Sequence, residues 1–443
     1  MAGWCVASDA VRSSGAAGAR PVSRANLAPD TALAARLFET LRERSFDGVG
    51  ITRVAYGPGE AMAHALLAEE GAALGLERMV DPIGNQYLTL PGADRTRPKI
   101  ILGSHLDSVP EGGNFDGAAG VLAGLAAVAG MARAGYQPAQ DVTVMCIRAE
   151  EAGAWFPTSY PGSRGALGAL GAADLAVKRR DSGKTLAEHM REEGFDPGFA
   201  AAGGKMLSPE NTAAFLELHI EQGPTLENEG VPLAIVTGIP GSRRFRAARV
   251  LGEYNHSGAT ARKYRRDAAA ALAELVYRLD AYWVELESRG QRLVCTFCEM
   301  ATTAEAGFTK IAGEARFSLD IRSVEMASCD AMVARLHALV AEIEARRGVR
   351  FELGAESGSQ PSVMDATMRA GLARAADGLG IAHLAMASGA GHDAAAFAAA
   401  GIPAAMLFVR NQNGSHNPAE AMRLPDFDLA CQVITKWLQD MTQ

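Results

Sequence analysis

The stretch that most constrains this chain is 103–120, with the sequence GSHLDSVPEGGNFDGAAG. A largely apolar run, 99–103, leads into His105, and Asp107 follows two residues later. Asp116 lies beyond a glycine-containing loop, at the start of a segment rich in Ala, Gly, Leu and Val. A loop with a solvated histidine and aspartate is one interpretation. We favour a metal site, because imidazole and carboxylate groups are the nitrogen and oxygen ligands that first-row divalent ions bind.

Four apolar runs have the length and spacing of buried strands, at 99–103, 142–147, 213–218 and 404–409. Long apolar runs that alternate with helical patterns indicate a largely parallel sheet covered by helices on both faces. In such sheets, ligands bind beyond the carboxyl ends of the strands. We therefore predict an α/β catalytic domain with a mixed, largely parallel sheet, and a site along that edge.

The segment 241–355 has a different rhythm from the rest of the chain. Its apolar patterns predict the order β-α-β-β-α-β, which is typical of a ferredoxin-like α+β unit. The main sheet then resumes with a helix at 365–378 and the strand at 404–409. A length of 443 residues allows two or three domains. We predict a disordered tail, a first catalytic part, an inserted lid or dimerisation domain and a second catalytic part, at 1–27, 28–240, 241–355 and 356–443.

Metal-binding side chains also follow the other predicted strands. Glu150 and Glu151 come after the second strand, His219 directly follows the third, and His416 lies in a loop beyond the fourth. The chain has only nine histidines, so packing alone explains poorly why three of them sit at strand ends with carboxylates. One carboxylate can bridge two ions. The pattern predicts two divalent ions with the ligands His105, Asp116, Glu151, His219 and His416.

Two further carboxylates near these ligands have other expected roles. Asp107 is placed to accept the free ring N–H of His105 and so to fix its tautomer. Adjacent carboxylates cannot both point at one ion from a strand end. Glu150 is therefore free to act as the general base on a metal-bound water. Five nitrogen and oxygen ligands without cysteine suit zinc, manganese, cobalt or nickel.

Several motifs make the pattern more specific. The sequences GSHLDS, NFDG, LHIEQGP, GEYNHSGAT, LDIRS, SGAGHDA and GSHNP occur in this order, with the pair Glu150–Glu151 after the second motif. Over about residues 30–440 the chain resembles the hydantoinase/carbamoylase family of dinuclear metal amidohydrolases, within the M20 clan. That group includes N-carbamoyl-L-amino acid hydrolases, β-ureidopropionases and allantoate amidohydrolases.

The resemblance implies a role for each ligand. Asp116 would bridge the two ions, His105 and His219 would complete one ion, and Glu151 and His416 the other. Glu150 falls where the family has its general base. The resemblance also implies a cis peptide bond between Asp116 and Gly117.

The resemblance further implies substrate contacts and a homodimer. Gln222, His256 and Arg322 fall on substrate-contacting positions, and His392 falls in a loop close to the site. His256, which would also steady the oxyanion, would reach the active site of the neighbouring subunit. Arginine is well shaped to bind the substrate carboxylate with two parallel hydrogen bonds, and we expect Arg322 to do so.

Three departures from the family pattern alter the predicted substrate pocket. An Arg-Phe pair after the glutamates is replaced by a stretch ending in Trp155 and Phe156. A Thr-Pro-Met motif appears as Thr260, Ala261 and Arg262. A substrate-binding asparagine is replaced by Thr309, so Thr309 is our candidate for that position.

These features predict an enzyme that hydrolyses a linear amide or ureido C–N bond in a small carboxylated substrate. An N-carbamoyl-L-amino acid is the leading candidate. Allantoate, an N-acyl amino acid or a dipeptide are alternatives within the same clan. A non-catalytic binding protein on the same scaffold is a rival, and the retention of Glu150 with all five ligands argues against it.

Composition excludes some other partners. A net charge of −8 argues against nucleic acid as the main partner. No apolar run approaches the ~18 residues of a membrane span, and the first residues lack the apolar core of a signal peptide. We therefore expect a cytoplasmic protein that does not bind membranes. The basic runs 243–246 and 262–266 are interpreted as solvated faces, with attraction of an acidic substrate as the alternative.

Overall fold

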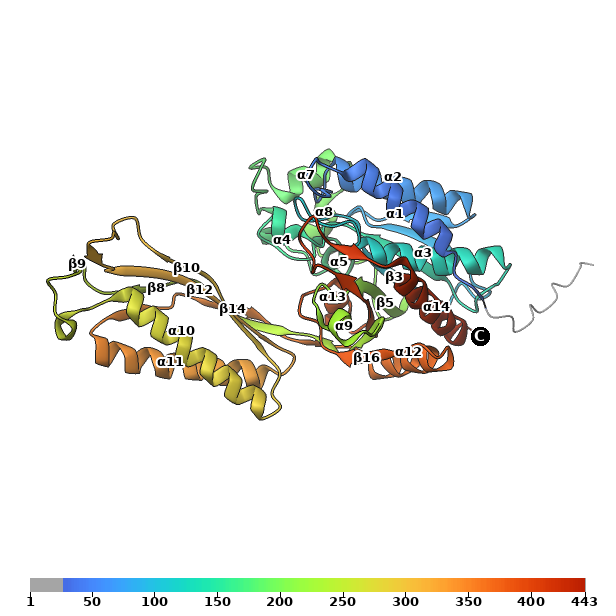
Figure 1. Cartoon of the computed structure of the whole chain (residues 1–443). Coiled ribbons are helices and arrows are strands. Elements are labelled where there is room, and N and C mark those ends of the chain that lie inside the picture. The colour runs from blue at the N-terminus through green and yellow to red at the C-terminus, as the bar shows by residue number, and fades with distance from the viewer. Residues whose placement is uncertain (1–26, 443) are drawn as a thin grey trace, which may run out of the picture.

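The computed structural model describes residues 27–442 and contains two units, each with its own sheet (Figure 1). The tail predicted at 1–27 lies outside the described residues except for Leu27. Each unit also has its own hydrophobic core. Within the described part, no helix is long and apolar enough to cross a membrane.

The larger unit is built on a mixed, eight-stranded sheet. Its four central strands, β4, β3, β5 and β17, are parallel, whereas β1–β2, β2–β4 and β17–β6 are antiparallel pairs. This confirms the predicted mixed, largely parallel α/β sheet. In spatial order the strands are β1 (Glu77–Val80), β2 (Gln86–Leu90), β4 (Val142–Ile147), β3 (Lys99–His105), β5 (Thr212–Ile220), β17 (Ala404–Val409), β6 (Leu233–Val236) and β16 (His383–Met386).

Side chains alternate between the two faces of this sheet, as strand geometry requires. Ile100 and Leu102 pack in one core cluster, and Ile101 packs in another. Helices α5 (Pro161–Ala166) and α13 (Asp393–Ala399) cover the Ile101 face. The opposite face packs against α1 (Thr31–Ser45), α2 (Pro58–Ala73), α3 (Ala118–Arg133), α12 (Ala366–Gly378) and α14 (Leu424–Met441).

Helix α3 brings the site close to the sheet because its first turn is made of small residues. A Cβ at Gly120 would lie 2.2 Å from the carbonyl oxygen of Leu218 in β5, so only glycine allows this approach. Thirteen of the sixteen residues of α3 are buried, so this helix lies inside the protein and not on its surface. The start of α3 is thereby held against the ends of β3 and β5.

The smaller unit has a four-stranded antiparallel path with two long helices on one face (Figure 1). The strands lie in the order β10-β12-β8-β13, and β14 (Glu356–Ser359) also pairs with β8. In chain order the elements are β8 (Gly241–Leu251), α10 (Ala268–Ser288), β10 (Val294–Thr302), β12 (Glu314–Ser323), α11 (Met326–Arg347) and β13 (Arg350–Glu352).

Short elements connect and extend the two units. The chain leaves the larger unit through β7 (Gly238–Ile239) and returns through β15 (Ser362–Val363), and these strands pair with each other. A second ribbon, of β9 (Asn255–His256) and β11 (Lys310–Ile311), belongs to the smaller unit. The other short elements are α4 (Ala152–Trp155), α6 (Ala172–Leu175), α7 (Leu186–Glu192), α8 (Pro197–Ala201), α9 (Thr225–Glu229), η1 (Arg262–Tyr264), β18 (Asn411–Gln412) and β19 (Ala421–Met422).

Candidate metal centre and active site

The five predicted ligands come from one edge of the main sheet. His105 is the last residue of β3, and His219 lies next to the last residue of β5. Glu151 follows β4, and His416 lies in the loop beyond β17 and β18. Because these parallel strands end at the same edge, they deliver residues that are far apart in sequence to one place.

These side chains form two groups that share Asp116. The first contains His105, Asp116 and His219, and the second contains Asp116, Glu151 and His416, with ligand atoms within 4.8 Å of one another in each group. Asp116 Oδ1 lies 3.1 Å from His219 Nε2 and 3.5 Å from His105 Nε2. The other oxygen, Oδ2, lies 3.6 Å from His416 Nε2, which is 2.8 Å from Glu151 Oε1.

The arrangement fits divalent metal ions. His105 Nε2 and Asp116 Oδ1 are buried and have no hydrogen-bond partner among the described residues. An unsatisfied buried polar atom is costly, and a cation between these atoms would satisfy both. Burial would raise the pKa of Asp116, but His219 and His105 hold that pKa well below its usual range. The residue is therefore held as a carboxylate, the form in which it can bind a metal.

Glycine is required beside this centre. Gly117 has a φ of +65°, and a Cβ there would lie 2.4 Å from the ring of His105. The expectation of a cis bond between Asp116 and Gly117 was wrong, since this bond is trans.

Asp107 contacts His105 and the adjacent residues Glu150 and Glu151. His105 Nδ1 lies 3.1 Å from the backbone carbonyl oxygen of Asp107, its hydrogen-bond partner, and 3.3 Å from Asp107 Oδ1, the acceptor that the sequence predicts. The same carboxylate accepts hydrogen bonds of 3.1 Å from the backbone amides of Glu150 and Glu151. Asp107 therefore fixes the position of the glutamate pair as well as the orientation of the His105 ring.

The adjacent glutamates point in different directions. Glu151 contacts His416, whereas Glu150 Oε2 lies 3.8 Å from His105 Nε2. Glu150 is buried, and burial is the main reason why its pKa is raised well above its usual range, although His105 opposes the shift. A carboxyl group with a raised pKa beside the metal groups is suited to accept and release a proton.

Three residues hold Asp116 from the other side. Gln222 Nε2 donates to Asp116 Oδ2 at 2.8 Å, and Ser415 Oγ donates to the same oxygen at 2.5 Å. Glu420 accepts from the backbone amides of Phe115 and Asp116 at 2.8 and 3.2 Å. The sequence analysis missed Ser415 and Glu420. Their only sequence signal is that they lie in the same segment as His416.

His392 packs against His219, one of the three residues of the first group. Its ring is buried and stands at 4.5 Å, edge to face, from that of His219, while its Nε2 lies 2.9 Å from Ser388 Oγ. Burial lowers the pKa of His392 well below its usual range. Glu217, which sequence analysis missed, completes a third group with His219 and His392. This geometry suits His392 to support His219.

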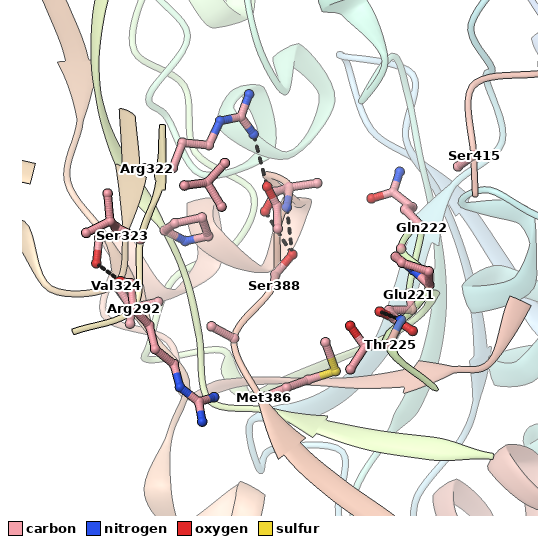
Figure 2. A pocket seen from close by; sticks show the side chains of 18 of the residues that line it. Glu221, Gln222, Thr225, Arg292, Arg322, Ser323, Val324, Met386, Ser388 and Ser415 are labelled. Atoms are coloured by element: carbon pink, nitrogen blue, oxygen red, sulfur yellow. Dashed lines mark hydrogen bonds between the residues drawn. The ribbon is translucent and has the colours of Figure 1, made fainter. Parts of the chain in front are cut away.

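A pocket of about 710 Å³ opens beside the two groups of candidate ligands, between the two units. Figure 2 shows Arg322 and Ser388 on one side of it and Gln222 and Ser415 on the other. His416 also lines this pocket. Much of the remaining wall is apolar and is formed by Pro240, Leu293, Val294, Val324 and Met386.

Arg322 is held in place by its neighbours. Its Nε and Nη2 donate to Asp320 Oδ2 at 3.0 and 2.8 Å, and its Nη1 donates to the carbonyl oxygen of Gly389 at 3.1 Å. Asp320 and Arg322 are thus on one face of β12, as their spacing predicts. The guanidinium is oriented toward the loop that forms the pocket rim.

His256 and Thr309 do not join the metal groups of their own chain. Both are exposed, and Figure 1 shows β9 at the end of the smaller unit that is distant from the larger unit. The amide of Ser257 donates to the carbonyl of Thr309 at 2.9 Å, so the two segments lie together. His256 Nδ1 accepts from the amides of Gly258 and Ala259 at 3.1 and 3.0 Å.

Comparison with known proteins assigns the class of this fold and site. Residues 101–440 match the model of peptidase family M20/M25/M40. The chain is 34% identical to an allantoate amidohydrolase from Bacillus subtilis, covering 89% of this chain and 93% of that protein. It is 32% identical to an N-carbamoyl-L-amino-acid amidohydrolase from Paenarthrobacter aurescens, covering 91% and 97%.

The solved structures agree with this. A hydantoinase/carbamoylase family amidase from Burkholderia ambifaria superimposes with a TM-score of 0.82 at 30% identity, covering 94% of this chain and 98% of that chain. The chain therefore belongs to the M20 peptidase family, and its relatives include hydantoinase/carbamoylase amidases. It is a hydrolase that acts on amide bonds.

Proposed function

We propose that the chain binds two divalent metal ions and hydrolyses a linear amide or ureido C–N bond in a small carboxylated substrate. The observation that carries this proposal is the sharing of Asp116 by two ligand groups beside a pocket that contains an arginine. His105 and His219 would hold one ion, Glu151 and His416 the other, and Asp116 both. Zinc, manganese, cobalt and nickel all suit these ligands.

Bound metal ions would polarise the scissile carbonyl and lower the pKa of a water molecule, which supplies the nucleophile. Glu150 takes a proton from that water and delivers it to the leaving nitrogen as the C–N bond breaks. Its burial supports this role, because a raised pKa lets one carboxyl group both accept and donate the proton. Asp107 keeps Glu150 in position through the backbone amide of that residue.

Arg322 and Gln222 are the proposed contacts for the substrate. A substrate carboxylate would replace the Gly389 carbonyl at Arg322 Nη1, while Asp320 keeps the rest of the guanidinium oriented. Gln222 already lies beside the proposed metal ligands, because its side chain donates a hydrogen bond to Asp116. His392, predicted in the same set, would act through His219, because its ring packs against that ligand.

We propose that the active protein is a homodimer in which His256 and Thr309 complete the neighbouring subunit's pocket. Their exposure at the end of the smaller unit supports this, because neither residue has a role in its own chain's site. His256 would then donate to the oxyanion that forms on the scissile carbonyl. Such an arrangement makes the smaller unit both a lid and a dimerisation domain.

An N-carbamoyl-L-amino acid with an apolar side chain is the preferred substrate. The apolar wall of Leu293, Val294, Val324 and Met386 suits such a side chain better than it suits the additional polar groups of allantoate. Allantoate is the second candidate, because relatives of both names match the chain at similar identity.

The test is ammonia release from a panel of substrates after the protein is loaded with each of the four metals in turn. The panel contains N-carbamoyl-L-amino acids with apolar, polar and acidic side chains, allantoate, and N-acetyl amino acids assayed for the free amine. We expect the fastest turnover with apolar N-carbamoyl-L-amino acids. Faster turnover of allantoate would make allantoate the preferred substrate in place of an N-carbamoyl-L-amino acid. No turnover of any compound with any metal would contradict the proposed activity.

A further inference from the structure

A second cleft lies on the smaller unit and shares no lining residue with the pocket of Figure 2. Its volume is about 920 Å³. One wall is formed by η1 and the residues up to the start of α10, and the other by the end of α11. Its charged lining residues are Arg262, Lys263, Arg265, Arg266, Arg346 and Arg347, with Glu253 and Asp267.

The lining has a strong excess of positive charge. Six basic and two acidic side chains give it a formal charge of +4, in a chain whose net charge is −8. Asp267 is the N-cap of α10, where its side chain accepts from the amide of Ala270 at 3.0 Å. A concentrated positive potential on an otherwise acidic protein attracts anions to this place.

Some of these cations are paired and some are not. Arg266 pairs with Glu253 at 2.5 Å, and Arg347 pairs at 2.7 Å with Glu274, which also contacts Arg346. In contrast, the guanidinium of Arg262 has no carboxylate or hydrogen-bond partner among residues 27–442. The ammonium group of Lys263 has no hydrogen bond or ion pair within that range either, and lies 4.8 Å from the centre of the Tyr264 ring.

The cleft is shaped by the packing of its two walls. Gly348 ends α11 with a φ of +63°, and a Cβ there would lie 3.3 Å from Nε of Arg266. The Arg266 side chain therefore lies against the end of α11 and joins the two walls. Arg265 fixes the first wall by donating to the carbonyls of Thr260 and Ser257, at 2.9 and 2.5 Å.

We propose that this cleft is a binding site for a small anion with two or more charged groups, phosphates or carboxylates. Guanidinium groups pair with either kind of group through two parallel hydrogen bonds. The unpaired charges of Arg262 and Lys263 would bind one group. The opposite wall would bind a second, because Arg346 and Arg347 share the single carboxylate of Glu274 and keep an excess of positive charge. The volume exceeds what a single carboxylate or phosphate fills. This inference does not depend on the identity of the substrate.

The cleft also contacts the segment that carries His256. Arg265 holds the carbonyls of two residues that follow His256, in the same wall as Arg262. An anion bound to this wall would restrict the segment that carries His256. Occupancy of the cleft is thereby positioned to influence the neighbouring subunit's site in the proposed homodimer.

The test uses naphthalene-1,3,6-trisulfonate, a fluorescent trivalent anion whose sulfonates coordinate metals weakly. Its fluorescence anisotropy is followed on the full-length, metal-loaded protein at fixed ionic strength. We expect saturable binding with one site per chain, at least tenfold tighter than binding of naphthalene-1-sulfonate. The double variant Arg262→Glu/Lys263→Glu should weaken binding at least tenfold, and the neutral variant Arg262→Gln/Lys263→Gln by a smaller factor.

The matched control is Arg44→Glu/Arg97→Glu, which makes the same change of net charge at two exposed residues of the larger unit. This variant should bind the trisulfonate within twofold of wild type. Equal weakening in both charge-reversal variants would contradict the proposal, because only the overall charge would then matter. Unchanged binding in Arg262→Glu/Lys263→Glu would also contradict it.

Displacement of the bound probe identifies the natural chemistry. Fructose 1,6-bisphosphate represents phosphate ligands and tricarballylate represents polycarboxylates. Displacement by the first and not the second assigns the site to phosphates, and the reverse assigns it to carboxylates. Failure of both to displace the probe at a hundredfold excess would contradict a site for anions of either class.

Discussion

The two units place their candidate functional residues in opposite ways. In the larger unit, His105, Asp116 and His219 are buried and fixed by contacts with their own chain. In the smaller unit, His256 lies on the two-residue strand β9 and Thr309 lies in the loop before β11. Both are exposed, and neither contacts His105, Asp116 or His219. One half of the proposed site is thus preorganised within a chain, whereas the other half would be completed only in the proposed homodimer.

The largest expected effect lies in the preorganised half. Glu150→Gln removes the proton carrier, so kcat should fall by roughly 10²–10⁴-fold, which is the usual range for loss of general acid–base catalysis. The metal content should stay near that of wild type. Steady-state kinetics and elemental analysis of one preparation measure both quantities.

Glu151→Gln is the matched control for that variant. It changes the neighbouring residue in the same way, but it should lose metal because Glu151 contacts His416 in the second group. If Glu150→Gln loses metal and Glu151→Gln keeps it, the roles of the two glutamates are exchanged.

The next effect lies in the exposed half and tests whether assembly matters. His256→Ala should lower kcat by roughly 10²–10³-fold through loss of an oxyanion donor, without changing metal content. Mixing His256→Ala subunits with Glu150→Gln subunits should restore activity, because each hybrid dimer has one site with both residues intact. Hybrids that form but stay inactive would place His256 outside the neighbouring site.

A smaller effect is expected where the two units meet. Arg322→Lys keeps the charge but loses the planar guanidinium that Asp320 orients toward the substrate carboxylate. KM for carboxylated substrates should therefore rise roughly 10–100-fold, as for loss of a charge-assisted bond of about 1.5–3 kcal/mol. Turnover of the corresponding carboxamides should change little. Arg292→Lys, in the same pocket wall, is the control. Equal losses on acids and carboxamides would leave Arg322 a structural residue.

The smallest effect concerns stability of the larger unit. Gly120→Ala places a methyl group against the Leu218 carbonyl, and such overpacking lowers the free energy of unfolding by about 1–3 kcal/mol. Gly378→Ala, at the end of α12 with open space around it, should instead raise that free energy by about 0.4–1 kcal/mol. Denaturant unfolding measures both. Equal values for the two variants would show that the close approach of α3 to β5 is not tight.

The sequence predicted the main elements of the fold because they bury long apolar runs. The strands at 142–147 and 404–409 were predicted with their exact bounds. Strands β6 and β16 were missed, since each has only four residues and β16 is incompletely buried. Short runs carry too little periodic pattern to distinguish a strand from a loop.

The same contrast holds for the site. Residues at the carboxyl end of a strand, such as His105 and His219, were predictable because parallel strands end at one edge. Glu217 and Glu420 were not, because their partners are brought to them only by the tertiary fold. The position of His256 relative to the metal groups likewise depends on how the smaller unit is placed, which sequence pattern does not describe. The expected cis bond at Asp116 was wrong.

The central claim is that Asp116 is shared by two metal ions. The most direct test is the metal content per chain of wild type, His416→Ala and Asp116→Ala after dialysis against trace-free buffer. The account predicts two ions in wild type, one in His416→Ala, and close to none in Asp116→Ala. Wild-type protein with a single ion, or Asp116→Ala with the same content as His416→Ala, would contradict a shared carboxylate.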